Sequence, residues 1–142
     1  MTTQLEKLGS ELTLYAARLV RLLRRDLPQP VGMRVLSVLD ESGPLGVTQL
    51  ALVDQCSQPT MSGIVQGLVD RGWVGKQADP ADRRSALVGL TPAGRQILTE
   101  ARRANGAAIA RRLSSAGVRA DEVATAVTVL RAVLESEGST HS

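Results

Sequence analysis

The segment from Asp79 to Gly94 constrains the fold more than any other part of the chain. A polar stretch that contains two arginines is followed there by an apolar run and then by a helix start. The apolar run suits a β-strand, and a second strand candidate, residues 73–77, lies just upstream. The two runs predict a β-hairpin with Arg83 and Arg84 near its tip. A hairpin that extends cations from a folded body suits a phosphate backbone or a narrow minor groove.

The residues before the hairpin predict a helix-turn-helix. A helix is expected over residues 31–42, and a short one opens near Thr48, which we take as its N-cap. Ser57 is expected to cap the next helix, whose first turn tolerates Pro59. Gly72 is placed to end that helix in a left-handed conformation. With the hairpin, these elements make a winged helix.

Long helices are expected on both sides of the winged helix. The first, residues 3–27, carries a seam spaced alternately by three and four: Leu5, Leu8, Leu12, Tyr15, Leu19 and Leu22. Such a seam favours packing on another helix of the same chain or of a partner, and the alternative is an ordinary amphipathic helix docked on its own domain. Thr91 is expected to cap a helix over residues 92–113, and a last helix over 121–135 has a Val/Leu stripe.

The predicted fold class is therefore mainly α with a small β-hairpin wing. The expected division is an N-terminal dimerisation helix (1–30), a winged helix-turn-helix DNA-binding domain (31–91), and C-terminal dimerisation helices with a tail (92–142). Tyr15 and Trp73 are the sole aromatic residues, so the core is expected to be aliphatic. The formal net charge of +3 is mild, so its distribution matters more than its sum. A single cysteine, and no visible leader or membrane span, favour a cytoplasmic location.

The helix that Ser57 caps has two faces of different chemistry. Four apolar residues recur at helical spacing and are expected to face the core: Met61, Ile64, Val65 and Leu68. The N-terminus and the opposite face carry the candidate DNA contacts: Ser57, Gln58, Pro59, Thr60, Ser62, Gly63 and Gln66. Glutamine can pair with adenine, and a threonine methyl can touch the thymine methyl. We interpret this face as a major-groove surface, and a merely solvated polar face is the alternative.

The tip of the hairpin offers three further candidates. We expect Arg84 to enter the minor groove, Arg83 to contact a phosphate, and Asp82 to orient the two arginines. The alternative is a local ion pair in a solvated turn, which contributes little at a surface.

Residues 82–85 followed by 90–94 resemble the wing and the following helix start of the MarR family of bacterial transcriptional regulators. Residues 58–62 followed by 68–74 resemble that family's recognition helix and its exit into the wing. The flanking helices match the family's dimerisation elements, so the resemblance covers the whole chain. One departure is Gly63, where many members carry a basic residue.

The resemblance implies a homodimer, often a repressor, that binds a pseudo-palindromic operator in double-stranded DNA. It also implies a ligand cleft between the dimerisation helices and each winged domain, where small anionic or phenolic compounds act to release the DNA. For this chain we expect a small aromatic acid. The candidate lining residues of this cleft are Tyr15, Arg18, Met33 and Arg34. The rival hypothesis is a winged helix that serves protein interaction or sequence-blind architectural DNA binding.

An enzyme, a metal site and a cofactor are not expected. The one histidine, His141, lies in the tail, where a general base would have no fixed position. Clustered histidines and cysteines, which a transition metal needs, are missing from the sequence. Cys56 is interpreted as a small hydrophobic residue of the core, and an oxidant sensor is the alternative.

Overall fold

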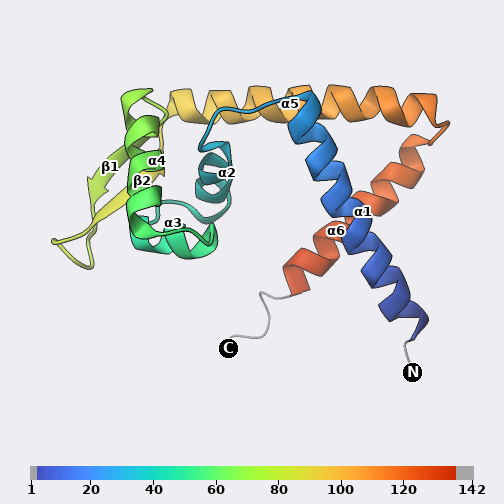
Figure 1. The fold of residues 1–142 in the computed structure, drawn as a ribbon, viewed down its shortest axis with the longest axis horizontal. Coiled ribbons are helices and arrows are strands. Elements are labelled where there is room, and N and C mark those ends of the chain that lie inside the picture. Colours follow the sequence, from blue (N-terminus) through green and yellow to red (C-terminus); the bar gives the residue numbers. More distant parts are fainter. Residues whose placement is uncertain (1–2, 137–142) are drawn as a thin grey trace. The chain divides into compact units, whose positions relative to one another are not determined.

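The computed structural model describes residues 3–136, which form six α-helices and one two-stranded antiparallel sheet (Figure 1). The predicted fold class, a mainly helical winged helix, is confirmed. The elements in chain order are α1 (Gln4–Asp26), α2 (Met33–Ser42), α3 (Val47–Val53), α4 (Gln58–Asp70), β1 (Val74–Ala78), β2 (Ala86–Leu90), α5 (Pro92–Ser115) and α6 (Ala120–Glu135).

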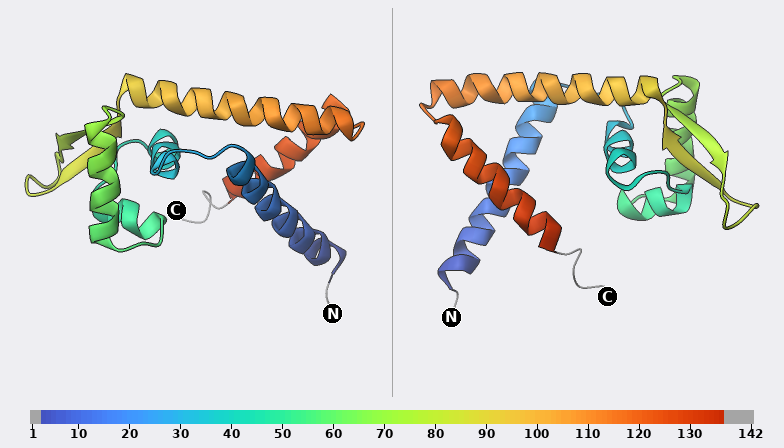
Figure 2. Two further views of the ribbon diagram at one scale, coloured as in Figure 1. Left: turned by 45° about the horizontal axis from the view of Figure 1, so that its top comes forward. Right: turned by 180° about the vertical axis from the view of Figure 1, so that it is seen from behind.

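The chain divides into two compact units within α5, between Asn105 and Gly106. The first unit contains α1, the winged helix and most of α5, and the second contains the end of α5 and α6 (Figure 2). The functional division expected from the sequence, 1–30, 31–91 and 92–142, stays a prediction. The expected tail, residues 138–142 with His141, lies outside the described residues. No helix within residues 3–136 has the length and apolar character to span a membrane.

The core belongs to the winged helix. Its buried side chains come from α2, α3, α4, both strands and the second turn of α5: Val35, Leu36, Leu39, Leu50, Ala51, Met61, Val65, Leu68, Val74, Val88 and Leu98. All of them are aliphatic or methionine, as the scarcity of aromatic residues predicted. Because α4 contributes three fully buried side chains, its orientation on the domain is fixed by packing.

The end of α4 leads directly into the wing. Gly72 has φ of +77°, and the N–H groups of Gly72 and Trp73 donate to the carbonyls of Val69 and Leu68. The strand therefore begins at Val74, one residue later than predicted, because Trp73 still belongs to the helix terminus. β1 pairs with β2 from Val74–Leu90 to Ala78–Ala86.

Thr91 joins three elements at the base of the wing. Its hydroxyl donates to the Gly72 carbonyl at 2.6 Å and accepts from the Gly94 N–H at 3.1 Å. The second bond caps α5, as predicted. The hairpin and α5 are thereby tied to the end of α4.

Two other helix starts differ from the sequence-based expectation. Thr48 is not an N-cap, because α3 begins one residue earlier at Val47, and the Gln49 side chain accepts the Gly46 N–H at 3.0 Å. The second helix begins at Met33 rather than at residue 31, since Val31 and Gly32 form a turn. Ser57 does cap α4, accepting the Thr60 N–H at 3.2 Å.

Candidate nucleic-acid interface

The exposed side of helix α4 is uncharged except for Asp70 in its last turn. Met61, Val65 and Leu68 are buried and Ile64 is partly buried, so the opposite side is free of core contacts. Five predicted DNA contacts are exposed there and are called the recognition face below: Gln58, Thr60, Ser62, Gly63 and Gln66. Pro59 is also exposed, in the first turn. The structure therefore brings the predicted α4 residues together on one element.

Internal hydrogen bonds preset two side chains of this face. The Ser57 hydroxyl donates to Thr60 Oγ1 at 2.8 Å while it accepts the Thr60 N–H, so it is engaged in the helix cap. The Thr60 hydroxyl is held as an acceptor, with its own proton free to point outward. Gln66 Nε2 donates to Asp70 Oδ1 at 2.9 Å, which directs the carboxamide along the helix and leaves its oxygen free.

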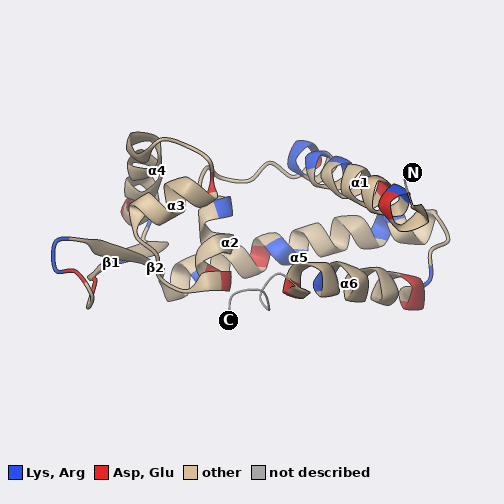
Figure 3. Cartoon of the chain, turned by 90° about the horizontal axis from the view of Figure 1, so that it is seen from below, with Lys and Arg blue, Asp and Glu red and all other residues tan. Residues whose placement is uncertain are grey.

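The wing tip is a turn held by carboxylates. Asp79 Oδ1 accepts the Ala81 N–H at 2.9 Å, and Asp82 Oδ1 accepts the Arg84 N–H at 3.0 Å. Asp82 therefore orients the arginines through the backbone, since its carboxylate forms no ion pair with a guanidinium within residues 3–136. Arg83 and Arg84 are exposed at the tip, where Figure 3 shows the cationic segment of the hairpin loop. Both cations are available to an external anion.

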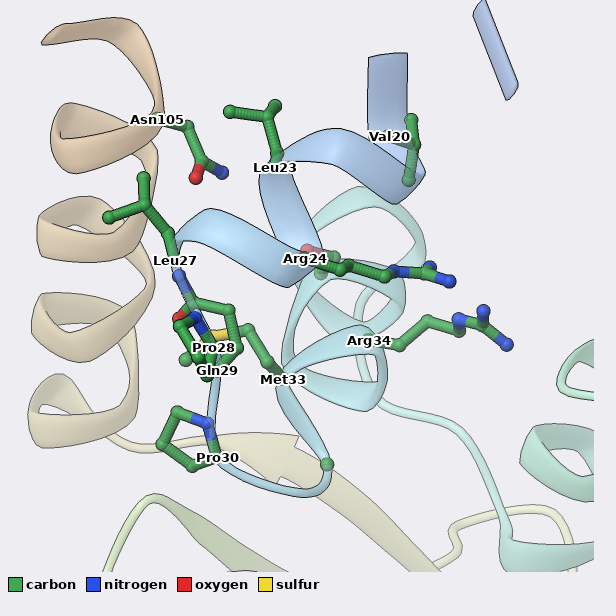
Figure 4. A pocket seen from close by; sticks show the side chains of 12 residues that line it. Val20, Leu23, Arg24, Leu27, Pro28, Gln29, Pro30, Met33, Arg34 and Asn105 are labelled. Atoms are coloured by element: carbon green, nitrogen blue, oxygen red, sulfur yellow. The ribbon is translucent and has the colours of Figure 1, made fainter. Parts of the chain in front are cut away.

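A cavity of about 580 Å³ lies in the first unit beside the end of α1. We call it the α1–α2 cavity, and Figure 4 shows its lining. The lining residues are Val20, Leu23, Arg24, Leu27, Pro28, Gln29, Pro30, Gly32, Met33, Arg34, Ser37 and Asn105. The wall is mainly aliphatic, two arginines are its charged groups, and no carboxylate of residues 3–136 lines it. Its size and chemistry suit a small organic anion.

The structure divides the four predicted cleft residues between two places. Met33 and Arg34 line the α1–α2 cavity. Tyr15 and Arg18 border a separate hollow on α1, where the Arg18 guanidinium stacks 5.4 Å from the centroid of the Tyr15 ring. Tyr15 and Arg18 are therefore not brought together with Met33 and Arg34, because they lie on a different face of α1 from the residues that border the cavity.

Ion pairs hold both ends of α2. Arg34 Nη1 lies 2.8 Å from Asp54 Oδ1 at the end of α3. Asp40 pairs with two arginines of α5, at 2.9 Å from Arg95 Nη1 and 2.8 Å from Arg102 Nη1. The hydrogen bond from Arg102 is the main cause that lowers the pKa of Asp40 below its ordinary value of 3.8, and partial burial opposes it.

Comparison with known proteins identifies the architecture. The family model of the MarR family matches residues 30–86, which span α2 to the start of β2. An uncharacterised HTH-type transcriptional regulator of Mycobacterium bovis is 33% identical over 113 residues, 77% of this chain and 79% of the relative. Another, from Mycobacterium leprae, is 34% identical over 102 residues, 69% of this chain and 71% of the relative. The chain belongs to the MarR family.

Solved structures of MarR proteins share the fold over nearly the full length. The wild-type apo form of MarR from E. coli is 25% identical, with a TM-score of 0.63 over 94% of this chain and 99% of that one. A structure of the multiple antibiotic resistance repressor MarR is 27% identical, with a TM-score of 0.70 over 89% and 94%. The protein is a DNA-binding transcriptional regulator of the MarR family and not an enzyme.

Sequence reasoning did not name every residue that lines the α1–α2 cavity. Arg24, Gln29 and Asn105 line the α1–α2 cavity but were not among the predicted cleft residues. The two prolines that follow α1 signal a sharp break, and this break could have indicated that the last turn of α1 borders a cavity. Cys56 is partly buried and packs against the core.

Proposed function

We propose that the protein is a sequence-specific repressor that binds a pseudo-palindromic operator as a homodimer in the cytoplasm. The observation that carries this proposal is the exposed, uncharged recognition face of α4 beside a wing whose two tip arginines form no ion pair within residues 3–136. Hydrogen-bonding side chains without cations favour reading base edges over sequence-blind attraction to phosphates. In this arrangement α4 enters the major groove and the wing reaches the adjacent minor groove.

The DNA part is tested by binding titrations on the DNA upstream of the protein's own coding sequence and on unrelated DNA, at several salt concentrations. Replacing Arg84 by Ala should weaken binding to both and reduce the salt slope by about one. Replacing Thr60 or Gln66 by Ala should relax discrimination at one or two base positions, by about 1–3 kcal/mol for each lost contact.

Arg103→Ala, a change of an exposed arginine on α5, is the matched control and should leave the binding unchanged. Equal affinity of the parent for upstream and unrelated DNA would support a sequence-blind architectural module instead. Unchanged binding by Arg84→Ala at every salt concentration would remove the wing from the interface.

The homodimer is supported by the apolar surface that the flanking helices expose. Neither α1 nor α6 has a buried residue, although α1 carries Leu5 at 80% exposure and α6 carries Leu134 at 77%. Contiguous apolar surfaces of this kind mark interaction sites. A second copy of this chain supplies matching helices, and the family resemblance favours that partner.

We further propose that the α1–α2 cavity binds a small aromatic acid that weakens DNA binding. Arg24 and Arg34 supply two guanidiniums for a carboxylate, and the aliphatic wall accommodates the ring. A ligand acts on DNA affinity only through its different affinities for the DNA-competent and incompetent states. Titrating salicylate against the protein–DNA complex tests this. Release at millimolar concentrations is expected, and the absence of both release and binding would reject the cavity as an effector site.

A further inference from the structure

Arg34 belongs to two sites at once. Its side chain lines the α1–α2 cavity, and its Nη1 donates to Asp54 Oδ1 at 2.8 Å. The side chains of Arg34 and Asp54 are 56% and 21% exposed, so the pair lies at the surface, within reach of a competing anion. Across residues 3–136, this is the one side-chain hydrogen bond that joins α2 to α3 or α4. The Arg34 guanidinium is thus a polar link between the cavity and the helix-turn-helix, beside the packing of Gly32 and Met33 on its core.

Asp54 is at the turn that sets the start of the recognition helix. It is the C-cap of α3, and its N–H donates to the Leu50 carbonyl. The next residue, Gln55, has φ of +54°, a conformation that a non-glycine residue adopts at some energetic cost. Ser57, the N-cap of α4, follows two residues later. The Arg34–Asp54 bond therefore braces a short, strained connection between α3 and α4.

Arg24 supplies the second cation that a competing anion needs. It belongs to the last turn of α1, and its side chain extends in the same direction as that of Arg34 (Figure 4). Arg24 makes no ion pair with any residue in the described part of the chain, and the cavity has no carboxylate of its own. An anionic group that approaches Arg34 would therefore also form an ion pair with Arg24, whereas Asp54 pairs with Arg34 alone.

We propose that the anionic group of a cavity ligand takes Arg34 from Asp54, and that loss of this brace is how the ligand lowers affinity for DNA. This mechanism rests on the proposed effector function of the α1–α2 cavity. DNA that needs a fixed start of α4 favours the state with the Arg34–Asp54 pair, and the ligand favours the state without it. DNA and the cavity ligand then lower each other's affinity for the protein by the same factor. Exposed ion pairs are weak, so the factor due to this exchange is about two- to fivefold.

Asp54→Asn tests the exchange because it weakens the competitor and leaves the cavity intact. Salicylate binding to the free protein is measured by calorimetry, and DNA binding is measured by titration without salicylate. The variant should bind salicylate about two- to fivefold more tightly and DNA more weakly by a similar factor. Asp40→Asn is the matched control, since it breaks ion pairs at the other end of α2 that do not line the cavity. It should leave salicylate affinity unchanged.

Arg24→Gln provides a second test that does not touch Asp54. It should weaken salicylate binding at least fivefold and leave DNA affinity without salicylate unchanged. Equal salicylate affinity of the parent, Asp54→Asn and Asp40→Asn would overturn the exchange while leaving the cavity as an effector site. Absence of salicylate binding to every variant would overturn both the exchange and the effector site. The DNA-binding proposal would not be affected, because the Arg84 and Gln66 variants test it separately.

Discussion

The winged helix and the flanking helices use apolar residues in opposite ways. Within residues 33–98, leucine, valine and methionine side chains from several elements close around one core. In α1 and α6 the same residue types remain exposed, and neither helix has a buried residue. The winged helix is therefore stabilised within one chain, whereas the flanking helices expose the apolar side chains that the proposed homodimer would bury.

The largest expected effect is on assembly. Leu12→Glu places a carboxylate in the apolar seam of α1, and burying such a charge without a partner costs several kcal/mol. The dimer dissociation constant should therefore rise by a factor on the order of 100 or more, as measured by analytical ultracentrifugation over a concentration series. Leu14→Glu is the matched control, because Leu14 is exposed on the other side of α1, off the predicted seam. A parent protein that sediments as a 15.0 kDa monomer at micromolar concentration would contradict the homodimer.

The next largest expected effect is on the stability of the winged helix, which has its own core. A Cβ at Gly94, in the first turn of α5, would overlap the carbonyl oxygen of Trp73, which is backbone and cannot rotate away. Gly94→Ala should lower the free energy of unfolding by about 1–3 kcal/mol, as read from urea denaturation. Gly106→Ala, also in α5 but with open space around its Cβ position, should instead raise it slightly. Equal stability of the two variants would show that the base of the wing can yield at that contact.

The sequence predicted the local features of the winged helix well. Apolar spacing and the Ser57 and Thr91 caps placed α4 and α5, because these signals act within one or two turns. The errors at Thr48 and Trp73 have another cause. Gln49 caps α3 from inside the helix, and the Trp73 N–H completes the end of α4. Both depend on which backbone groups pair in three dimensions, which spacing along the chain does not specify.

The candidate sites were predictable to different degrees for the same reason. The recognition face follows from the periodicity of one helix, so its exposed residues could be named from sequence. The α1–α2 cavity is built from α1, a proline-containing loop, α2 and Asn105 of α5. Its lining depends on how these segments pack, so of the predicted cleft residues Met33 and Arg34 line it, whereas Arg18 does not and Arg24 does. The partnership of Arg34 with Asp54, 20 residues later, carries no sequence signal.

A smaller effect concerns Gly63 and Gly67, which are both exposed on α4. A Cβ at Gly63 or Gly67 would meet open space, so packing within the chain does not require glycine there. Alanine at each position should therefore stabilise the helix by about 0.5–1 kcal/mol, measured by thermal or urea unfolding. If the helix backbone approaches DNA closely, the same changes should weaken DNA binding, because a methyl group would stand between them.

Gly106→Ala again provides the control for this pair of measurements. It should give a similar gain in stability with no change in DNA affinity, since it belongs to α5 and not to the recognition face. If Gly63→Ala and Gly67→Ala gain stability and still bind DNA as tightly as the parent, the α4 backbone does not approach DNA closely at these positions.

The smallest expected effect is the pH dependence of the stability that Asp40 contributes. Its ion pairs with Arg95 and Arg102 join α2 to α5. Because its hydrogen bond from Arg102 lowers the pKa of Asp40 in the folded protein, the unfolded chain binds more protons as the pH approaches 3.8 from above. The contribution of Asp40 to stability is thus complete above its ordinary pKa and is lost as the pH falls through the lowered one. The arginine partners are more than half exposed, so solvent screens the interaction and the contribution is small.

Urea unfolding of the parent and of Asp40→Asn from neutral pH to below pH 3.8 measures this contribution. The parent should be the more stable protein by a constant margin at neutral pH, and the margin should shrink in acid, below the ordinary pKa of an aspartate. Adding salt at neutral pH should narrow the same margin, because screening weakens exposed ion pairs. A margin unaffected by acid and by salt would mean that Asp40 acts on α2 and α5 through its shape and neutral hydrogen bonds. The attachment of the winged helix to α5 would then depend on packing and on neutral hydrogen bonds such as those of Thr91.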